Sequence, residues 1–186
     1  MQRRTLVLNG TALLSMPVAL AFAADKAAER AEVKTKTSQA LQAFYKAEPK
    51  LKGEVANAPG YAIFTTFGLS FGLGGAGGKG LAHSNKSHHD VYMNIAQASA
   101  GLQLGASETR YLFVFTDAKS LAEFIDKGWD ASAQAGAGVG AGASAANAGA
   151  GAGSFAGGRL YELTKEGLQL GVSVSGLKAW KDTDLN

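Results

Sequence analysis

The chain contains no cysteine. It therefore forms no disulfide bonds, and it cannot carry the acylated N-terminal cysteine of a lipoprotein. It also lacks an uninterrupted apolar run of the roughly 20 residues that a membrane-spanning helix needs, because Asn9, Gly10 and Pro17 break its most apolar stretch. These absences argue against a disulfide framework and against a transmembrane anchor.

The start of the chain has the pattern of a cleaved signal peptide instead. Arg3 and Arg4 form a basic region, an apolar stretch follows, and Ala21-Phe22-Ala23 is a small-x-small cleavage site. We expect residues 1–23 to be removed and the periplasmic or secreted chain to begin at Ala24. The two arginines leave both the Sec and the twin-arginine route open.

Neither sign of charge predominates. The chain has 18 Lys and Arg against 15 Asp and Glu, and loss of the two signal-peptide arginines leaves 16 against 15, a net charge of +1. This balance gives no reason to expect a nucleic acid partner, so attraction to an anionic surface must come from local basic clusters. The mature length of about 163 residues (186 minus 23) fits one domain.

Catalytic signatures occur only in incomplete forms. Gly68–Gly72 matches the G-x-S-x-G elbow, but glycines rather than a helix follow it, and no acidic residue lies between Ser70 and the last histidine, His89. The glycine pattern at 72–77 also lacks a following helix, and Gly77-Gly78-Lys79 lacks two required residues of a P-loop. We predict that the protein is not an enzyme and uses no cofactor.

Metal-binding signatures are equally incomplete. Four potential ligands of zinc or copper lie close together in the sequence: His83, His88, His89 and Asp90. The polar residues 84–87 between them are typical of a solvated turn, which we expect here in place of a metal site. Asp182–Asn186 resembles the start of an EF-hand loop but lacks its glycine and glutamate, so we interpret it as a polar C-terminal segment.

Two helices are predicted. In Asp25–Ala47 the residues Val33, Leu41 and Phe44 recur at helical spacing, and Pro49 with Gly53 is expected to end the helix. We favour docking of this helix on a sheet over an interfacial position on a bilayer, because its first half is rich in alanine.

The second predicted helix is Ala118–Lys127. Asp117 or Thr116 can cap its start, and Gly128 suits its end.

Most of the remaining chain has the pattern of short strands. Five runs are separated by turn signals: Tyr61–Phe67, Lys79–Ser84, Val91–Ala98, Gly101–Ser107 and Tyr111–Phe115. Tyr111–Phe115 is apolar at every position and should be a central strand covered by a helix on one side. The predicted fold class is α+β, mainly an antiparallel sheet or partly closed barrel with an N-terminal helix and one internal helix.

Residues 131–158 consist almost wholly of Ala, Gly and Ser. Their composition permits a flexible linker. Glycines at alternate positions, including Gly138 and Gly140, favour two strands with a bare face that another backbone can approach closely. After them, Leu168, Leu170, Val172 and Val174 alternate with small or polar residues, which predicts a half-buried strand after a turn at 164–167.

Three segments, in this order, resemble the SYLF domain family. They are the opening strand Ala58-Pro59-Gly60-Tyr61-Ala62-Ile63-Phe64 with a glycine hairpin that runs to Gly80, the middle strand Gln97–Gly105, and the closing segment Leu160–Asn186. The resemblance covers a SYLF-like domain at 55–186, which follows the predicted signal peptide at 1–23 and a helical segment at 24–54. Eukaryotic members of this family are described as phosphoinositide-binding and in some cases actin-binding. The resemblance thus implies lipid binding, whereas actin is not an expected partner of an exported protein.

We therefore expect peripheral binding to anionic membrane lipids. The candidate residues are basic side chains near sheet ends together with one aromatic: Lys79, Arg110, Lys178, Lys181 and Trp180. An indole between two lysines suits the headgroup layer, although Trp180 capping the core is the alternative. The second hypothesis for function is a structural or self-assembling envelope protein, a homo-oligomer joined through its Gly/Ala strands and sheet edges.

Overall fold

The computed structural model describes residues 18–131, 153–155, 157–164, 167–170 and 176–186. Within these ranges the chain forms three helices and a seven-stranded antiparallel sheet, which confirms the α+β class. The elements are α1 (Val18–Ala47), α2 (Lys50–Asn57), β1 (Gly60–Ser84), β2 (His89–Phe115), α3 (Ala118–Lys127), β3 (Trp129–Asp130), β4 (Gly153–Phe155), β5 (Gly158–Thr164), β6 (Gly167–Leu170) and β7 (Leu177–Lys181).

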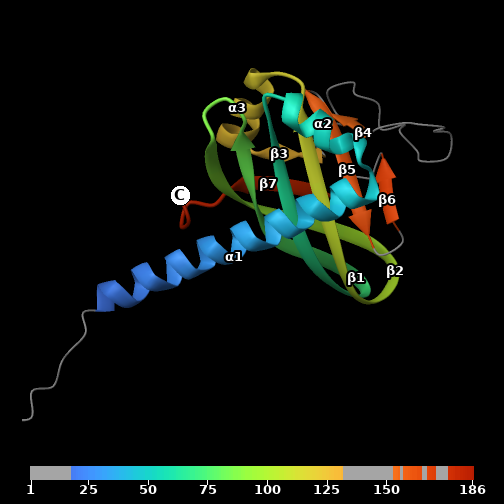
Figure 1. Ribbon diagram of the computed structural model, residues 1–186. Helices are drawn as coiled ribbons and strands as arrows, with labels where there is room; N and C mark the ends of the chain where they lie inside the picture. Colours follow the sequence, from blue (N-terminus) through green and yellow to red (C-terminus); the bar gives the residue numbers. More distant parts are fainter. Residues whose placement is uncertain (1–17, 132–152, 156, 165–166, 171–175) are drawn as a thin grey trace, which may run out of the picture.

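The strand β2 is the centre of the sheet. β1 pairs with it along one edge, from Ser84 opposite His89 to Tyr61 opposite Val114. On the other edge, β7 pairs with residues 93–97 and β5 pairs with residues 110–115. β3 adds to β7, and β4 and β6 add to β5. The two long strands curl strongly, so the sheet forms a half-barrel (Figure 1).

The predicted glycine hairpin lies within β1, so residues 68–78 form part of one long strand, and the turn between β1 and β2 lies at residues 85–88. The glycine run is extended because residues 95–107 of β2 pair with it. The five predicted strand runs therefore belong to two strands of 25 and 27 residues.

Glycines allow the two halves of β1 to touch. A Cβ atom at Gly78 would overlap the carbonyl oxygen of Thr65, and one at Gly80 would overlap the carbonyl oxygen of Ile63. Both contacts join residues of one strand, so β1 folds back against itself. The close backbone approach that we predicted for the segment at 131–158 is found here, at other glycines.

Apolar side chains cover both faces of the sheet. On the inner face, Phe64 and Phe113 pack against Phe124 of α3, together with Trp129 and Phe155. On the outer face, α1 and α2 cover the sheet through residues that form a second cluster: Phe44, Leu51, Val55, Ile63, Leu112 and Val114. Tyr111–Phe115 is thus central, as predicted, with helices on both faces.

The helix α1 differs from its prediction at its beginning. It starts at Val18, seven residues before Asp25, and ends at Ala47 as predicted. Its C-terminal half docks on the sheet, because Ala40 and Phe44 are fully buried, and its N-terminal end extends beyond the sheet (Figure 1). No helix in the described ranges has the length and apolar character needed to cross a membrane.

The helix α2 was not predicted. Gly53 lies inside it and has open space around it, and burial of Leu51 and Val55 outweighs the cost of about 1 kcal/mol that a glycine imposes on a helix. α3 has its predicted bounds. The Asp117 side chain accepts a hydrogen bond from the Ser120 N–H at its start, and Gly128 ends it with a φ of 73°.

Part of the Gly/Ala/Ser segment lies outside the described residues, including Gly138 and Gly140, as do Val172 and Val174. The strand pattern in the described remainder is confirmed at β4 and at β6. Gly167, the first residue of β6, has a φ of 124°, the positive value expected at this position.

Candidate functional site

The sheet register places three of the predicted residues on β1 and β7, the two strands that flank the first part of β2. Lys79 of β1 pairs with Asn94 of β2, and Asn94 pairs with Trp180 of β7. Lys178 lies two residues before Trp180, on the same outer face, because the intervening Ala179 is buried on the inner face. Trp180 is 39% exposed, so its ring is accessible from this face and is not one of the buried core residues.

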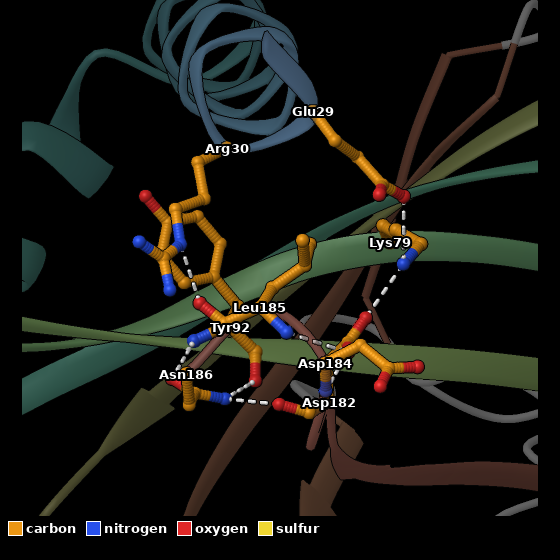
Figure 2. Close-up of polar contacts among 8 residues, drawn as sticks. All are labelled: Glu29, Arg30, Lys79, Tyr92, Asp182, Asp184, Leu185 and Asn186. Atoms are coloured by element: carbon orange, nitrogen blue, oxygen red, sulfur yellow. Dashed lines mark hydrogen bonds and ion pairs between the residues drawn. The ribbon is translucent and has the colours of Figure 1, made fainter. Parts of the chain in front are cut away.

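The charge of Lys79 is neutralised by two carboxylates. Its Nζ atom lies 2.6 Å from Oδ2 of Asp182 and 2.9 Å from Oε1 of Glu29 in α1 (Figure 2). Desolvation lowers the pKa of Lys79, but the hydrogen bonds that its ammonium donates to both carboxylates, together with their negative charge, outweigh it and raise the pKa above its usual value. Lys79 therefore fastens α1 to the sheet and has little free charge for a ligand.

Arg110 does not join the other predicted residues. It lies in the half of β2 that pairs with β5, whereas Lys178 and Trp180 lie beside the opposite half. Its guanidinium forms a 2.6 Å ion pair with Glu108. Two of the four predicted cations are thus paired with carboxylates at short distance.

The two lysines of β7 remain accessible. The Lys178 side chain is 61% exposed, and its Nζ lies 3.7 Å from Asp130, too far for a strong ion pair. Lys181 is exposed at the end of β7, and among the described residues it has no ion pair. Lys181 pairs with the buried Met93 in the sheet register, so the Lys181 side chain leaves the backbone on the inner face, at the margin of the sheet. The accessible site therefore consists of Lys178, Trp180 and Lys181.

The last five residues are an integral part of this region. Asp182 accepts hydrogen bonds from the N–H groups of Asp184 and Leu185, and Arg30 of α1 donates to the Leu185 carbonyl (Figure 2). Leu185 is 1% exposed and packs with Val33 and Tyr92. The interpretation of 182–186 as merely a polar end of the chain is wrong, and the apolar Leu185 was the signal for its docking.

Sequence reasoning also missed Phe67. This side chain is 56% exposed on β1, and the Lys36 ammonium lies 5.6 Å from its ring centre. Lys36 and Glu29 are seven residues apart and so share one side of α1. Glu29 contacts Lys79, and Lys36 contacts Phe67. The side chains of Phe67 and Lys79 therefore lie along the same side of α1. Phe67 and Trp180 are the exposed large apolar side chains of the described residues.

The catalytic and metal patterns gain no support from the backbone. Ser70 lies within β1, paired with Gly105, and not at the strand-to-helix turn of a nucleophile elbow. Within the described part of the chain, no group of three or more His, Cys, Asp and Glu side chains is arranged to hold a metal ion.

Two comparisons with known proteins bear on this arrangement. The model of the Ysc84 family, described as Las17-binding protein actin regulator, matches residues 96–186, from the middle of β2 to the end of β7 and beyond. Beta cell expansion factor A of Aeromonas veronii is 29% identical over 157 residues, which make up 84% of this chain and 58% of that protein. The chain thus spans less than two thirds of the length of this relative. The matched residues include the closing segment that resembled SYLF domains, so residues 96–186 of this chain are similar to the Ysc84, or SYLF, family.

Proposed function

We propose that this is an exported, non-catalytic protein that binds anionic phospholipid headgroups through the outer face at Lys178 and Trp180, with Lys181 at its margin. The observation that carries the proposal is the half-exposed indole of Trp180 between two accessible lysines. Indole rings favour the polar layer of a bilayer, where the apolar body and the N–H group are both accommodated. Export rests on the signal-peptide pattern of residues 1–23.

The surface around Trp180 suits close approach to a bilayer. Gly75 and Gly77 are exposed on β1, and no atom lies within 4 Å of the position that a Cβ atom of Gly77 would occupy. The sheet surface next to Lys79 and Asn94 therefore has no protruding side chains at the two glycine positions. Phe67 is a second exposed ring, on the side of α1 where Lys79 also lies.

The ion pairs reduce the expected affinity. A basic residue close to an anionic membrane contributes about 1 kcal/mol, and salt weakens this attraction within a Debye length of about 8–10 Å. Four free cations would contribute about 4 kcal/mol by this measure. Lys79 and Arg110 are paired, so Lys178 and Lys181 contribute about 2 kcal/mol, and binding should be weak and sensitive to salt.

Co-sedimentation with liposomes tests the proposal. Vesicles of phosphatidylcholine alone are compared with vesicles that also contain phosphatidylglycerol, using the mature chain and the double variant Lys178→Glu, Lys181→Glu. Loss of about 2 kcal/mol corresponds to a decrease in affinity of about 30-fold for the anionic vesicles, and charge reversal should cost at least this much.

A matched control makes the same change of charge elsewhere. Lys50 and Lys52 are exposed on α2, which contacts β5 through the ion pair of Glu54 with Arg159, and β5 and β7 pair with opposite halves of β2. Lys50→Glu, Lys52→Glu should sediment like the wild type. Equal losses in both double variants would show that net charge alone drives binding. Absence of wild-type sedimentation on every anionic vesicle would refute lipid binding itself.

A further inference from the structure

The turn between β1 and β2 brings two imidazole side chains together. His83 is the penultimate residue of β1 and His88 ends the turn, and their ring centres lie 6.3 Å apart with the ring planes inclined by 49°. Two imidazoles that share one metal ion have ring centres roughly 5 to 6.5 Å apart, given metal–nitrogen bonds of about 2.0 Å. The observed separation lies at the upper end of this range, where the two nitrogens bind the ion from nearly opposite sides.

The His83 ring is held in a fixed orientation. Its Nδ1 atom lies 2.7 Å from Oδ1 of Asp90, and the ring packs 5.2 Å from the ring of Tyr61. Asp90 also forms a 3.1 Å ion pair with Lys34 of α1. A histidine ligand held by a carboxylate through its second nitrogen is the usual arrangement in protein metal sites.

The contact with Asp90 decides which nitrogen of His83 is available. A carboxylate oxygen accepts hydrogen bonds, so Nδ1 of His83 donates to Oδ1 of Asp90. The lone pair of Nε2 is then free to bind a metal ion.

The backbone at His88 gives a second, independent indication. Its φ of 53° lies in the left-handed region, and His88 is the one residue other than glycine in the described ranges with a positive φ. Glycine or asparagine would suit this position better, and strained backbone tends to occur at functional sites. His88 is also exposed, so its ring is accessible to an ion from solvent.

We propose that His83 and His88 bind a divalent transition-metal ion, Cu²⁺ or Zn²⁺, with water completing its coordination. Imidazole nitrogen suits these ions, whereas Mg²⁺ and Ca²⁺ prefer oxygen ligands. With two protein ligands and an exposed position, the affinity should be moderate. Through Asp90 and Lys34, the bound ion would also reinforce the contact between the hairpin turn and α1. The proposal is independent of lipid binding.

His89 provides a matched control. It is exposed and adjacent to His88, but it begins β2 and pairs with Ser84, and no contact joins its ring to His83 among the described residues. The tag-free mature protein is titrated with Cu²⁺, Zn²⁺ and Mg²⁺ by calorimetry, and its melting temperature is measured with and without each ion. The variants are His88→Gly and His89→Ala.

For the wild type and His89→Ala we expect the same affinity for Cu²⁺ or Zn²⁺, a higher melting temperature with the ion, and no response to Mg²⁺. His88→Gly should bind at least tenfold more weakly and lose the metal-dependent rise. Its melting temperature without metal should equal or exceed that of the wild type, because glycine accepts the positive φ. Unchanged binding by His88→Gly, an equal loss in His89→Ala, or no wild-type binding at millimolar ion would overturn the proposal.

Discussion

The contact between the two halves of β1 predicts a large difference between two neighbouring glycines. At Gly78 a Cβ atom would overlap the Thr65 carbonyl oxygen and lie 2.8 Å from Cα of Thr66. At Gly77 it would meet nothing within 4 Å. Substitution by alanine therefore adds the same methyl group to the same strand in two opposite environments.

The loss of stability expected for Gly78→Ala depends on which atoms must move to admit the methyl group. The atoms that a methyl group at Gly78 would strike belong to the backbone, so no side-chain rotation can relieve the overlap, and one half of β1 must shift. Such overpacking costs about 1–3 kcal/mol. For a chain of this length the melting temperature should fall by roughly 2–4 °C for each kcal/mol. Gly77→Ala should be neutral or stabilising by about 0.4–1 kcal/mol, since alanine restricts the unfolded chain.

Thermal and denaturant unfolding, followed by circular dichroism, measure both variants beside the wild type. We expect Gly78→Ala to unfold at a lower temperature and a lower denaturant concentration than Gly77→Ala, with similar slopes. If the two alanine variants unfold together, the halves of β1 are not in contact, and the explanation of the half-barrel through Gly78 and Gly80 fails.

Two further predictions concern a partly buried carboxyl group and maturation. Burial raises the pKa of Glu162, with a smaller opposing contribution from the Tyr111 hydroxyl, so its effect on stability is most favourable at low pH and is lost as the pH rises through the raised pKa. Glu162→Gln should therefore be more stable than the wild type at pH 7 and equal to it below about pH 4. Parallel curves of unfolding free energy against pH would contradict this. Intact-mass measurement of the exported protein should find Ala24 as its first residue, and a mass that includes residues 1–23 would show a retained segment.

Local signals predicted α3 fully but missed α2. The cap at Asp117, the buried pair Leu121 and Phe124, and the terminal Gly128 all lie within a dozen residues. The helix α2 contains Gly53, which argues against a helix locally. Its stability comes from burial of Leu51 and Val55 against strands that lie elsewhere in the sequence. The sequence of the segment alone does not show this stabilisation by burial against distant strands.

The length of the strands could not be predicted for a related reason. Alternation of side chains identifies a strand, and a run of glycines has no side chains to alternate. The glycines of β1 have defined conformations because β2 pairs with them and because Gly78 and Gly80 contact the other half of the strand. The sequence predicted that bare glycine faces serve close backbone contact, but it could not identify which glycines do so.

In the candidate site, too, the sequence predicts the residue types but not their partners. The sequence identifies lysines, but the partners of Lys79 come from Glu29 in α1 and from Asp182, which is 103 residues further along the chain. Only the folded chain distinguishes this neutralised lysine from the accessible Lys178.

The ion pair of Lys79 also bears on how the protein could bind a membrane. Because Lys79 and Arg30 fasten α1 to the sheet and to the C-terminal segment, insertion of α1 into a bilayer would break these contacts and expose the apolar outer face beneath it. Contact through the uncovered face at Trp180 requires no such opening, so binding should leave α1 docked.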